Sequence, residues 1–312
     1  MSDLLTRVEQ LVKNGNTVCP LNADVYFEIL KQQDPLTLRA SVKLLDELSG
    51  GACLIPVTAR LPLEVAHFCE MAFSGPARVY ELHELVWTRP AYIIGFVTPD
   101  MHQLTRAQNV ELQKRFVDHL WEMTLFGLLD VMDFSKAAAR TYPFNDISGP
   151  LNQGKLDHAD VHKSFKSVFL SEVAGAVDVY KSEFADYFQY RFERDSGSTL
   201  SDKVKAEDES GVGIANLICE AFRLDRAGKA FSTIRIGAGL HAALRWDRKR
   251  KYKANDLFDF RHAEAALPYC DYFFTERSLR NLLSDRNLHF EEYFPCKVYS
   301  DPVEALVAIA SI

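Results

Sequence analysis

Residues 255–283 constrain the fold of this chain more than any other segment, because helix, strand and helix signals follow one another there. Apolar residues recur at helical spacing from Phe260 to Leu267, and Pro268 is expected to end that helix. A β-prone run, 272–274, is expected to form a buried strand, and residues 278–283 return to a helical pattern. The segment therefore predicts a helix–strand–helix unit, which is typical of α/β folds.

Further short strands are predicted near both ends of the chain, at 17–21, 52–57 and 296–299. Helices are predicted after Pro35, with glycines at 50 and 51 ending the helix, and after Pro302. Residues between the two strand-containing regions are almost entirely helical in pattern. The sequence therefore predicts an α/β fold, in which a small parallel sheet is sandwiched by helices. Its core would be discontinuous, made of 1–75 and 216–312, with a mainly helical insertion at 76–215.

Acidic residues lie near the predicted strand ends or just inside the helices that follow. Asp259 lies in the first turn of a predicted helix, Glu276 follows a strand, and Glu64 lies in the helix after the strand at 52–57. In open α/β sheets the carboxyl ends of the strands bind ligands. Carboxylates meeting there suit Mg²⁺ or Mn²⁺, which can activate a water for phosphodiester hydrolysis. Capping and the helix dipole also favour acids in first turns without any catalytic role.

Composition excludes several other classes of protein. The 312 residues carry a net charge of −7, which is not the overall charge typical of a nucleic-acid-binding protein, so any contact with nucleic acid would need a local basic patch. The six cysteines show no CxxC spacing, so we expect reduced thiols in a cytoplasmic protein rather than a zinc or redox motif. We find no signal peptide and no apolar run of the ~20 residues that a membrane span needs, so no membrane partner is expected.

Three segments, taken in order, resemble the motifs of PIN-domain nucleases. They are NADVYFEIL at 22–30, IPVTARLPLEVAHF at 55–68 and DFRHAEAALPYCDYFFTE at 259–276. The resemblance implies a metal-dependent endoribonuclease that uses Mg²⁺ or Mn²⁺ and acts on RNA rather than DNA. It also implies that an inhibitory protein partner and a homodimer are to be looked for. The implied catalytic residues are Glu64, Asp259 and Glu276, with Asp271 and Asn22 as additional metal ligands.

Two positions depart from the family pattern. Asn22 stands where the family has its first Asp, and Arg277 stands where the family's fourth acid is usual, with Glu276 one residue earlier. An amide can bind a metal through its oxygen, but it adds no charge and cannot act as a base. Asp24 or Glu28 can compensate for the first departure and Asp271 for the second. The alternative is a catalytically silent PIN-like module, whose insertion is an interaction surface.

Two other patterns bear on function. A dense basic run precedes the helix that carries Asp259, and we expect its residues Arg248, Lys249, Arg250 and Lys251 to contact phosphates, unless they form only a solvated helix end. Two carboxylate-x-x-His pairs also occur, Glu64 with His67 and Asp259 with His262. Such pairs on helices are typical of di-iron carboxylate proteins, so a di-iron oxidase is a second alternative.

Overall fold

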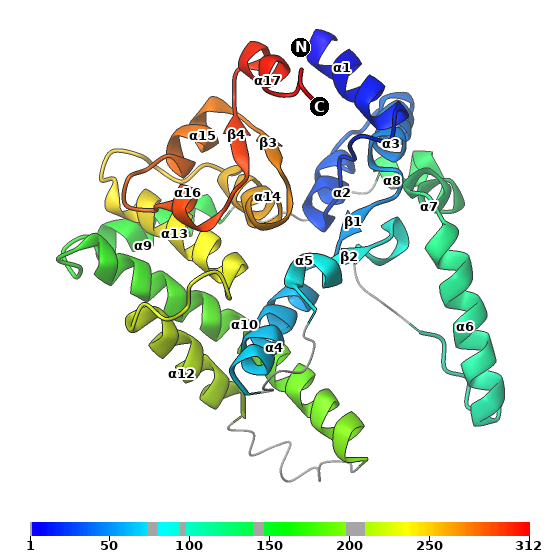
Figure 1. Cartoon of the computed structure of the whole chain (residues 1–312), viewed down its shortest axis with the longest axis horizontal. Helices are drawn as coiled ribbons and strands as arrows, with labels where there is room; N and C mark the ends of the chain where they lie inside the picture. Colours follow the sequence, from blue (N-terminus) through cyan, green and yellow to red (C-terminus); the bar gives the residue numbers. More distant parts are fainter. Residues whose placement is uncertain (1, 74–79, 94–97, 140–146, 198–209) are drawn as a thin grey trace. The chain divides into compact units, whose positions relative to one another are not determined.

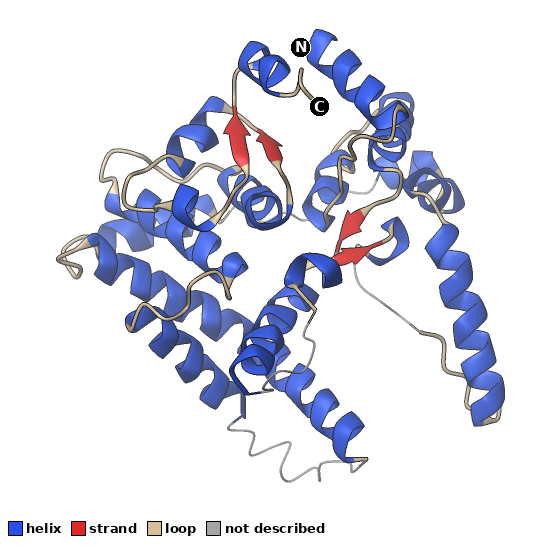
Figure 2. Ribbon diagram, in the orientation of Figure 1, coloured by secondary structure: helices blue, strands red, loops and turns tan. Residues whose placement is uncertain are grey.

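The computed structural model describes residues 2–73, 80–93, 98–139, 147–197 and 210–312, and these residues are mainly helical (Figures 1 and 2). The chain forms two compact units. Unit 1 comprises Met1–Pro56, Glu84–Asn145 and Asp301–Ile312, and unit 2 comprises Val57–His83 and Asp146–Ser300. Each unit is therefore built from segments that lie far apart in the sequence.

Unit 1 contains mostly short helices and one small sheet. Its elements are α1 (Ser2–Lys13), α2 (Ala23–Ile29), α3 (Pro35–Ser49), β1 (Cys53–Leu54), β2 (Trp87–Thr88), η1 (Pro90–Tyr92), α6 (Arg106–Glu122), α7 (Leu125–Val131), α8 (Phe134–Ala139) and α17 (Pro302–Ala308), and α5 (Leu82–Leu85) crosses its boundary.

The core of unit 1 lies between α3 and α7. Leu38 and Val42 of α3 and Leu125 and Leu129 of α7 belong to one buried cluster. Asp46 of α3 also accepts hydrogen bonds from the first two backbone N–H groups of α7, at 2.9 and 2.7 Å, so its carboxylate caps that helix.

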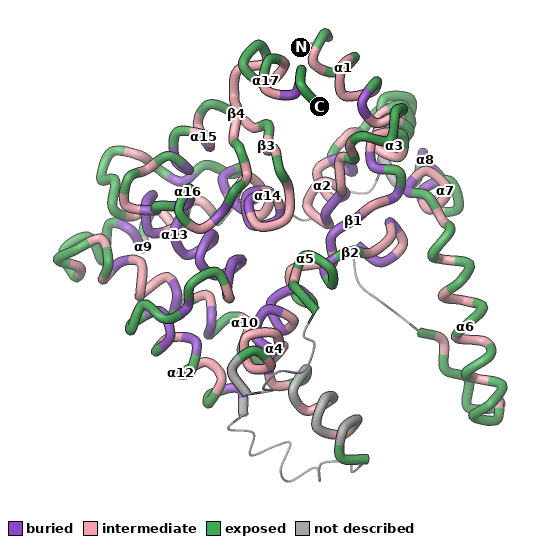
Figure 3. Tube along the Cα trace, viewed as in Figure 1, coloured by how far each residue is buried: buried purple, intermediate pink, exposed green. Residues whose placement is uncertain are grey.

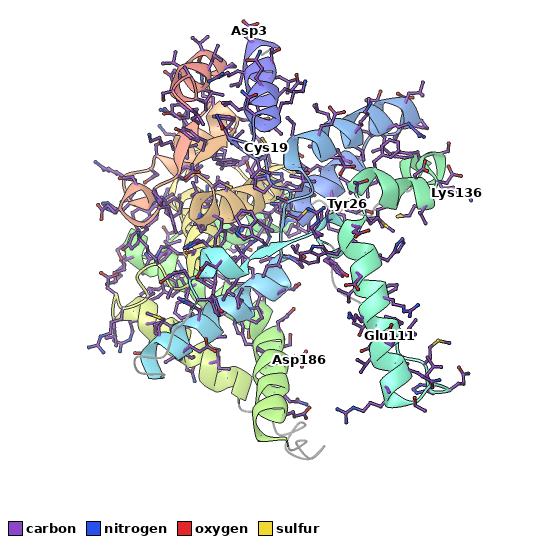
Figure 4. All side chains as sticks on the ribbon, turned by 45° about the vertical axis from the view of Figure 1, so that its right-hand side comes forward. Asp3, Cys19, Tyr26, Glu111, Lys136 and Asp186 are labelled. Carbon is purple, nitrogen blue, oxygen red and sulfur yellow. The ribbon has the colours of Figure 1, made fainter. Side chains whose placement is uncertain are left out.

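Two helices at the periphery of unit 1 differ in how they are held. Helix α17 lies against α1, where the Arg7 guanidinium donates to the carbonyl of Ala310 at 3.2 Å. Helix α6, by contrast, has no buried residue, and its exposed Glu111 pairs with Arg115 at 2.8 Å (Figures 3 and 4). Apolar packing therefore contributes little to α6 in this structure.

Unit 2 is assembled around α13 (Ser232–Trp246), which is buried on all sides from Ser232 to Leu244 except at the partly buried His241 (Figure 3). The long helix α10 packs against α13, α12 and α4, and α14 packs against the same central helix. The elements are α4 (Val57–Phe73), α9 (Ser148–Asp157), α10 (Phe165–Ser196), α12 (Ser210–Arg223), α13 (Ser232–Trp246), α14 (Asp256–Tyr269), β3 (Tyr272–Phe274), α15 (Arg277–Leu283), α16 (Phe290–Tyr293) and β4 (Lys297–Tyr299).

The prediction of an α/β fold with a parallel sheet sandwiched by helices is wrong. The strands of the described residues form two separate sheets of two strands each, β1 with β2 and β3 with β4. The predicted strand at 17–21 makes only an isolated parallel bridge, Leu21 to Cys53, and β1 pairs antiparallel with β2. Pro20 lacks a backbone donor, and α4 begins directly after Pro56, so little extended chain remains for pairing.

The helix–strand–helix order predicted for 255–283 is confirmed as α14, β3 and α15. Helix α14 extends one residue past Pro268, because a proline in the last turn sacrifices a single backbone hydrogen bond. The expectation that the strand is buried is wrong, since Phe274 is 39% exposed. Its neighbour Phe273 packs on the core, so β3 has one inner and one outer face.

Most described residues of the expected insertion, 76–215, are helical, from α6 to α10 and the start of α12. The two units follow tertiary packing rather than sequence pattern, and the expected boundaries at 75 and 216 stay a prediction. None of the helices in the described ranges has the length and apolar character needed to cross a membrane.

Candidate functional site

Glu64 lies on α4 and is completely buried against the first turn of α13. The backbone N–H of Thr233 donates to both of its carboxylate oxygens at 3.2 Å. Its Oε1 also accepts from the hydroxyl of Thr233 at 2.7 Å and from that of Tyr269, on α14, at 3.2 Å. One carboxylate therefore joins three helices of unit 2.

The position of Glu64 explains why it is buried. No side chain of α13 itself caps the start of that helix, which leaves backbone N–H groups that need an acceptor. Glu64 supplies this acceptor from α4, and the positive end of the helix dipole favours a carboxylate there. Arg60, also buried, donates from Nε to the hydroxyl oxygen of Thr233 at 3.0 Å and completes the network.

Burial raises the pKa of Glu64 to about 7, although the hydrogen bonds from Thr233 and the positive charge of Arg60 act in the opposite direction. Burial also raises the pKa of Tyr269 well above its usual value. A catalytic metal needs ligand positions that are open to water and substrate. The fully enclosed carboxylate of Glu64 does not offer them, so the structure gives this residue a structural role.

Asp259 and Glu276 lie at the same end of unit 2. Asp259 is in the first turn of α14, and Glu276 is the N-cap residue of α15, where its side chain makes no capping hydrogen bond. Arg250 links these turns, because its guanidinium contacts Asp256 of α14 at 3.5 Å and the carbonyl of Ser278 of α15 at 3.4 Å. Asp256, which the sequence pattern did not assign to the site, is thus an anchor for it.

Asp271 lies at the other end of β3. Its carbonyl accepts from the N–H of Lys297 where β4 begins, whereas Thr275 donates to the carbonyl of Tyr299 where β4 ends, both at 2.9 Å. At the rise of an extended strand, five residues separate Asp271 from Glu276 by roughly 16 Å. These two carboxylates therefore cannot share one metal ion.

Asn22 belongs to unit 1, where it is the N-cap residue of α2. Its Oδ1 accepts from the backbone N–H of Val25 at 2.9 Å. The amide oxygen that the resemblance implies as a metal ligand is thus used to cap a helix.

The described part of the chain contains no group of three or more His, Cys, Asp or Glu side chains placed to hold a metal ion. The two carboxylate–histidine pairs, Glu64 with His67 and Asp259 with His262, consequently do not assemble into a four-residue centre. His67 follows Glu64 by one turn on α4, and its buried Nε2 has no hydrogen-bond partner. No geometric feature of these pairs favours the di-iron alternative.

The basic run forms a loop, since α13 ends at Trp246 and α14 begins at Asp256. Arg248 is exposed and contacts Asp160 at 3.1 Å. Lys249 and Lys251 are exposed, whereas Arg250 is partly buried by its contacts with α14 and α15. Three of the four predicted phosphate contacts are thus accessible, and the fourth fixes the local structure.

Two side chains of helix α9, Lys155 and Asn152, form hydrogen bonds with the backbone of this loop and of the residues beside it. The buried ammonium group of Lys155 donates to the carbonyls of Leu244, Asp247 and Arg250, at 2.7, 2.5 and 2.5 Å. Asn152 donates to the carbonyl of Tyr252 at 3.0 Å and accepts from its N–H at 2.8 Å. We term these contacts of Lys155 and Asn152 the clamp. No local sequence pattern predicts it, because the residues that it joins lie 89 to 100 positions apart in the sequence.

Comparisons with protein-family models, with curated proteins and with solved structures found no match for this chain. The resemblance to PIN-domain nucleases therefore stays a prediction from the sequence motifs.

Proposed function

We propose that unit 2 hydrolyses phosphodiester bonds in single-stranded nucleic acid, with RNA preferred to DNA, in the presence of Mg²⁺ or Mn²⁺. The observation that carries the proposal is the position of Arg250, which joins the first turns of α14 and α15. Asp259 and Glu276 consequently lie at one end of the unit, next to an exposed basic loop. The preference for RNA comes from the sequence resemblance alone.

Two carboxylates at one end of the unit would be enough to hold such an ion. Mg²⁺ keeps several of its waters and is commonly bound by one or two carboxylates, with substrate phosphates completing its coordination. Asp259 and Glu276 provide two carboxylates, so a third protein ligand is not required. When bound, Mg²⁺ or Mn²⁺ supplies a water of lowered pKa and neutralises charge on the phosphate.

The remaining residues bind and orient the substrate. Exposed Lys249 and Lys251 neutralise phosphates of the nucleic-acid strand, and Arg250 holds the starts of α14 and α15 together. Lys155 and Asn152 hold the loop in one conformation, which reduces the ordering cost of binding. Glu64, Asp271 and Asn22 have no part in this proposed centre, for the geometric reasons given above.

The test is cleavage of labelled single-stranded RNA by the purified full chain with Mn²⁺. Asp259→Asn and Glu276→Gln should each lower the rate roughly 100-fold or more, since each removes a charge from the metal centre. Glu291→Gln, at an exposed acid on α16, is the matched control and should cleave like the parent protein, and EDTA should abolish cleavage.

Cleavage that survives both site substitutions would refute the assignment of the centre. A folded protein that cleaves neither RNA nor DNA would instead support the alternative of a catalytically silent interaction module.

A further inference from the structure

The β3–β4 sheet has two faces of different character. The two strands run parallel (Figure 2). Phe273 lies opposite Val298 and Phe274 opposite Tyr299, so paired residues lie on the same face. Phe273 and Val298 pack against the hydrophobic core of unit 2. The opposite face carries Tyr272, Phe274 and Tyr299 together with Lys297. The outer side of this small sheet is therefore aromatic.

The three rings form a compact group, which we term the aromatic platform (Tyr272, Phe274 and Tyr299). Ring centroids are 6.4 Å apart for Tyr272 and Phe274, 6.5 Å for Tyr272 and Tyr299, and 6.4 Å for Phe274 and Tyr299. The planes of the two tyrosines differ by only 25°. The ammonium group of Lys297 lies 5.8 Å from the centroid of Tyr272, so a positive charge accompanies the rings.

The outward face of such a sheet normally carries polar side chains, because apolar surface in water costs free energy. Here Phe274 is 39% exposed and both tyrosines are partly exposed. Aromatic rings on a sheet surface are a recurrent way of stacking the bases of single-stranded nucleic acid, with cationic side chains beside them for the phosphates. A mixture of rings and positive charge fits a strand of bases and phosphates better than it fits an apolar protein surface.

The platform also adjoins the proposed centre. Strand β3 ends at Phe274, two residues before Glu276, and Arg250 of the basic loop contacts the carbonyl of Ser278 just beyond it. A nucleic-acid strand whose bases stack on the aromatic platform would thus have its phosphates near Asp259 and Glu276. We propose that the aromatic platform binds the bases of single-stranded nucleic acid. This inference rests on the proposed function and names the substrate-binding surface of that site.

The test measures binding without catalysis, by fluorescence anisotropy of a labelled single-stranded oligonucleotide in EDTA with the full chain. Phe274→Leu and Tyr299→Leu keep an apolar side chain but remove the stacking surface. Each should weaken binding roughly 5- to 150-fold. Tyr80→Leu, at an exposed ring elsewhere in unit 2, is the matched control and should bind like the parent protein.

An abasic oligonucleotide of the same length separates stacking from charge. Its affinity should be low for the parent protein and should not change in the platform variants. Circular dichroism and thermal melting will show whether each variant is folded. Unchanged oligonucleotide affinity in folded Phe274→Leu and Tyr299→Leu would overturn the inference, and so would an equal loss for the abasic strand.

The outcomes also separate this inference from the proposed function. Parent protein that cleaves RNA, with platform variants that bind it normally, would refute the platform alone. Platform-dependent binding without cleavage would refute the catalytic proposal alone, and absence of any binding would refute both. A dimer that dissociates in the platform variants, without oligonucleotide binding, would show that a second copy of the chain covers the rings.

Discussion

The pKa of Glu64 predicts a pH dependence of stability that one substitution should remove. Burial raises this pKa to about 7 in the folded protein, from its ordinary value of 4.5. The folded protein therefore holds a proton that the unfolded chain releases. The contribution to stability is complete below about pH 4.5, declines as the pH rises, and is lost above about pH 7. At about 1.4 kcal/mol for each pH unit, the free energy of unfolding should fall by about 3 kcal/mol across this range.

Glu64→Gln isolates this effect. The amide oxygen of glutamine can still accept the hydrogen bonds that Thr233 and Tyr269 donate to Oε1, but the side chain does not ionise. At about pH 4.5 the variant and the parent should differ only by the cost of the buried amide donors, about 1–3 kcal/mol. Above about pH 7 the variant should gain about 3 kcal/mol relative to the parent, because the parent alone must bury a charge.

Urea unfolding at several pH values measures the difference. Trp246 is the tryptophan of unit 2, so its fluorescence reports that unit after Trp87 and Trp121 are replaced by Phe. Glu291→Gln, at an exposed acid, should leave the pH profile as it is in the parent. Parallel pH profiles for the parent and Glu64→Gln would refute the reasoning.

Three further predictions concern unit 2. Lys155→Met should lower the free energy of unfolding by about 2–4 kcal/mol in urea titrations, since three carbonyls lose a shared charged donor; unchanged stability would contradict the clamp. Gly237→Ala should destabilise the packing of α13 on α14 by about 1–3 kcal/mol in thermal melts, because the added Cβ would displace the buried carboxylate of Glu264 from its ion pair with Arg261; Gly213→Ala, with open space around it, is the control. The double substitution Lys249→Ala and Lys251→Ala should reduce the salt dependence of RNA affinity by about one phosphate contact per lysine without changing the melting temperature, and an unchanged slope would exclude these lysines from the interface.

Elements with strong local signals were predicted correctly from the sequence. Helix α3 begins with Asp34 as N-cap and Pro35 as its first residue, and it ends at Gly50, which adopts a left-handed conformation. Asp301 likewise caps α17, and β3 and β4 occur where β-prone runs had indicated them. These features depend on periodicity, caps and backbone preferences within a few residues, so the sequence alone determines them.

Strand pairing depended on the tertiary structure. Cys53 and Leu54 pair with β2. Of the strand predicted at 17–21, only Leu21 forms a β-bridge, with Cys53. Which strands pair depends on register and on packing between distant segments, and short runs of apolar residues do not specify either.

The roles of the charged residues were also decided by the tertiary structure. Sequence pattern placed Glu64, Asp259 and Glu276 in one class, as carboxylates near strand ends. In the structure Glu64 caps α13 across 169 positions of sequence, whereas Asp259 and Glu276 lie at one end of unit 2. The hydrogen bond from Lys155 to the carbonyl of Asp247 likewise joins residues that are 92 positions apart in the sequence. The sequence thus determined where acids and bases occur on helices and loops, and the fold decided which are buried and which are accessible, because burial and hydrogen bonding arise from contacts between segments that no local pattern records.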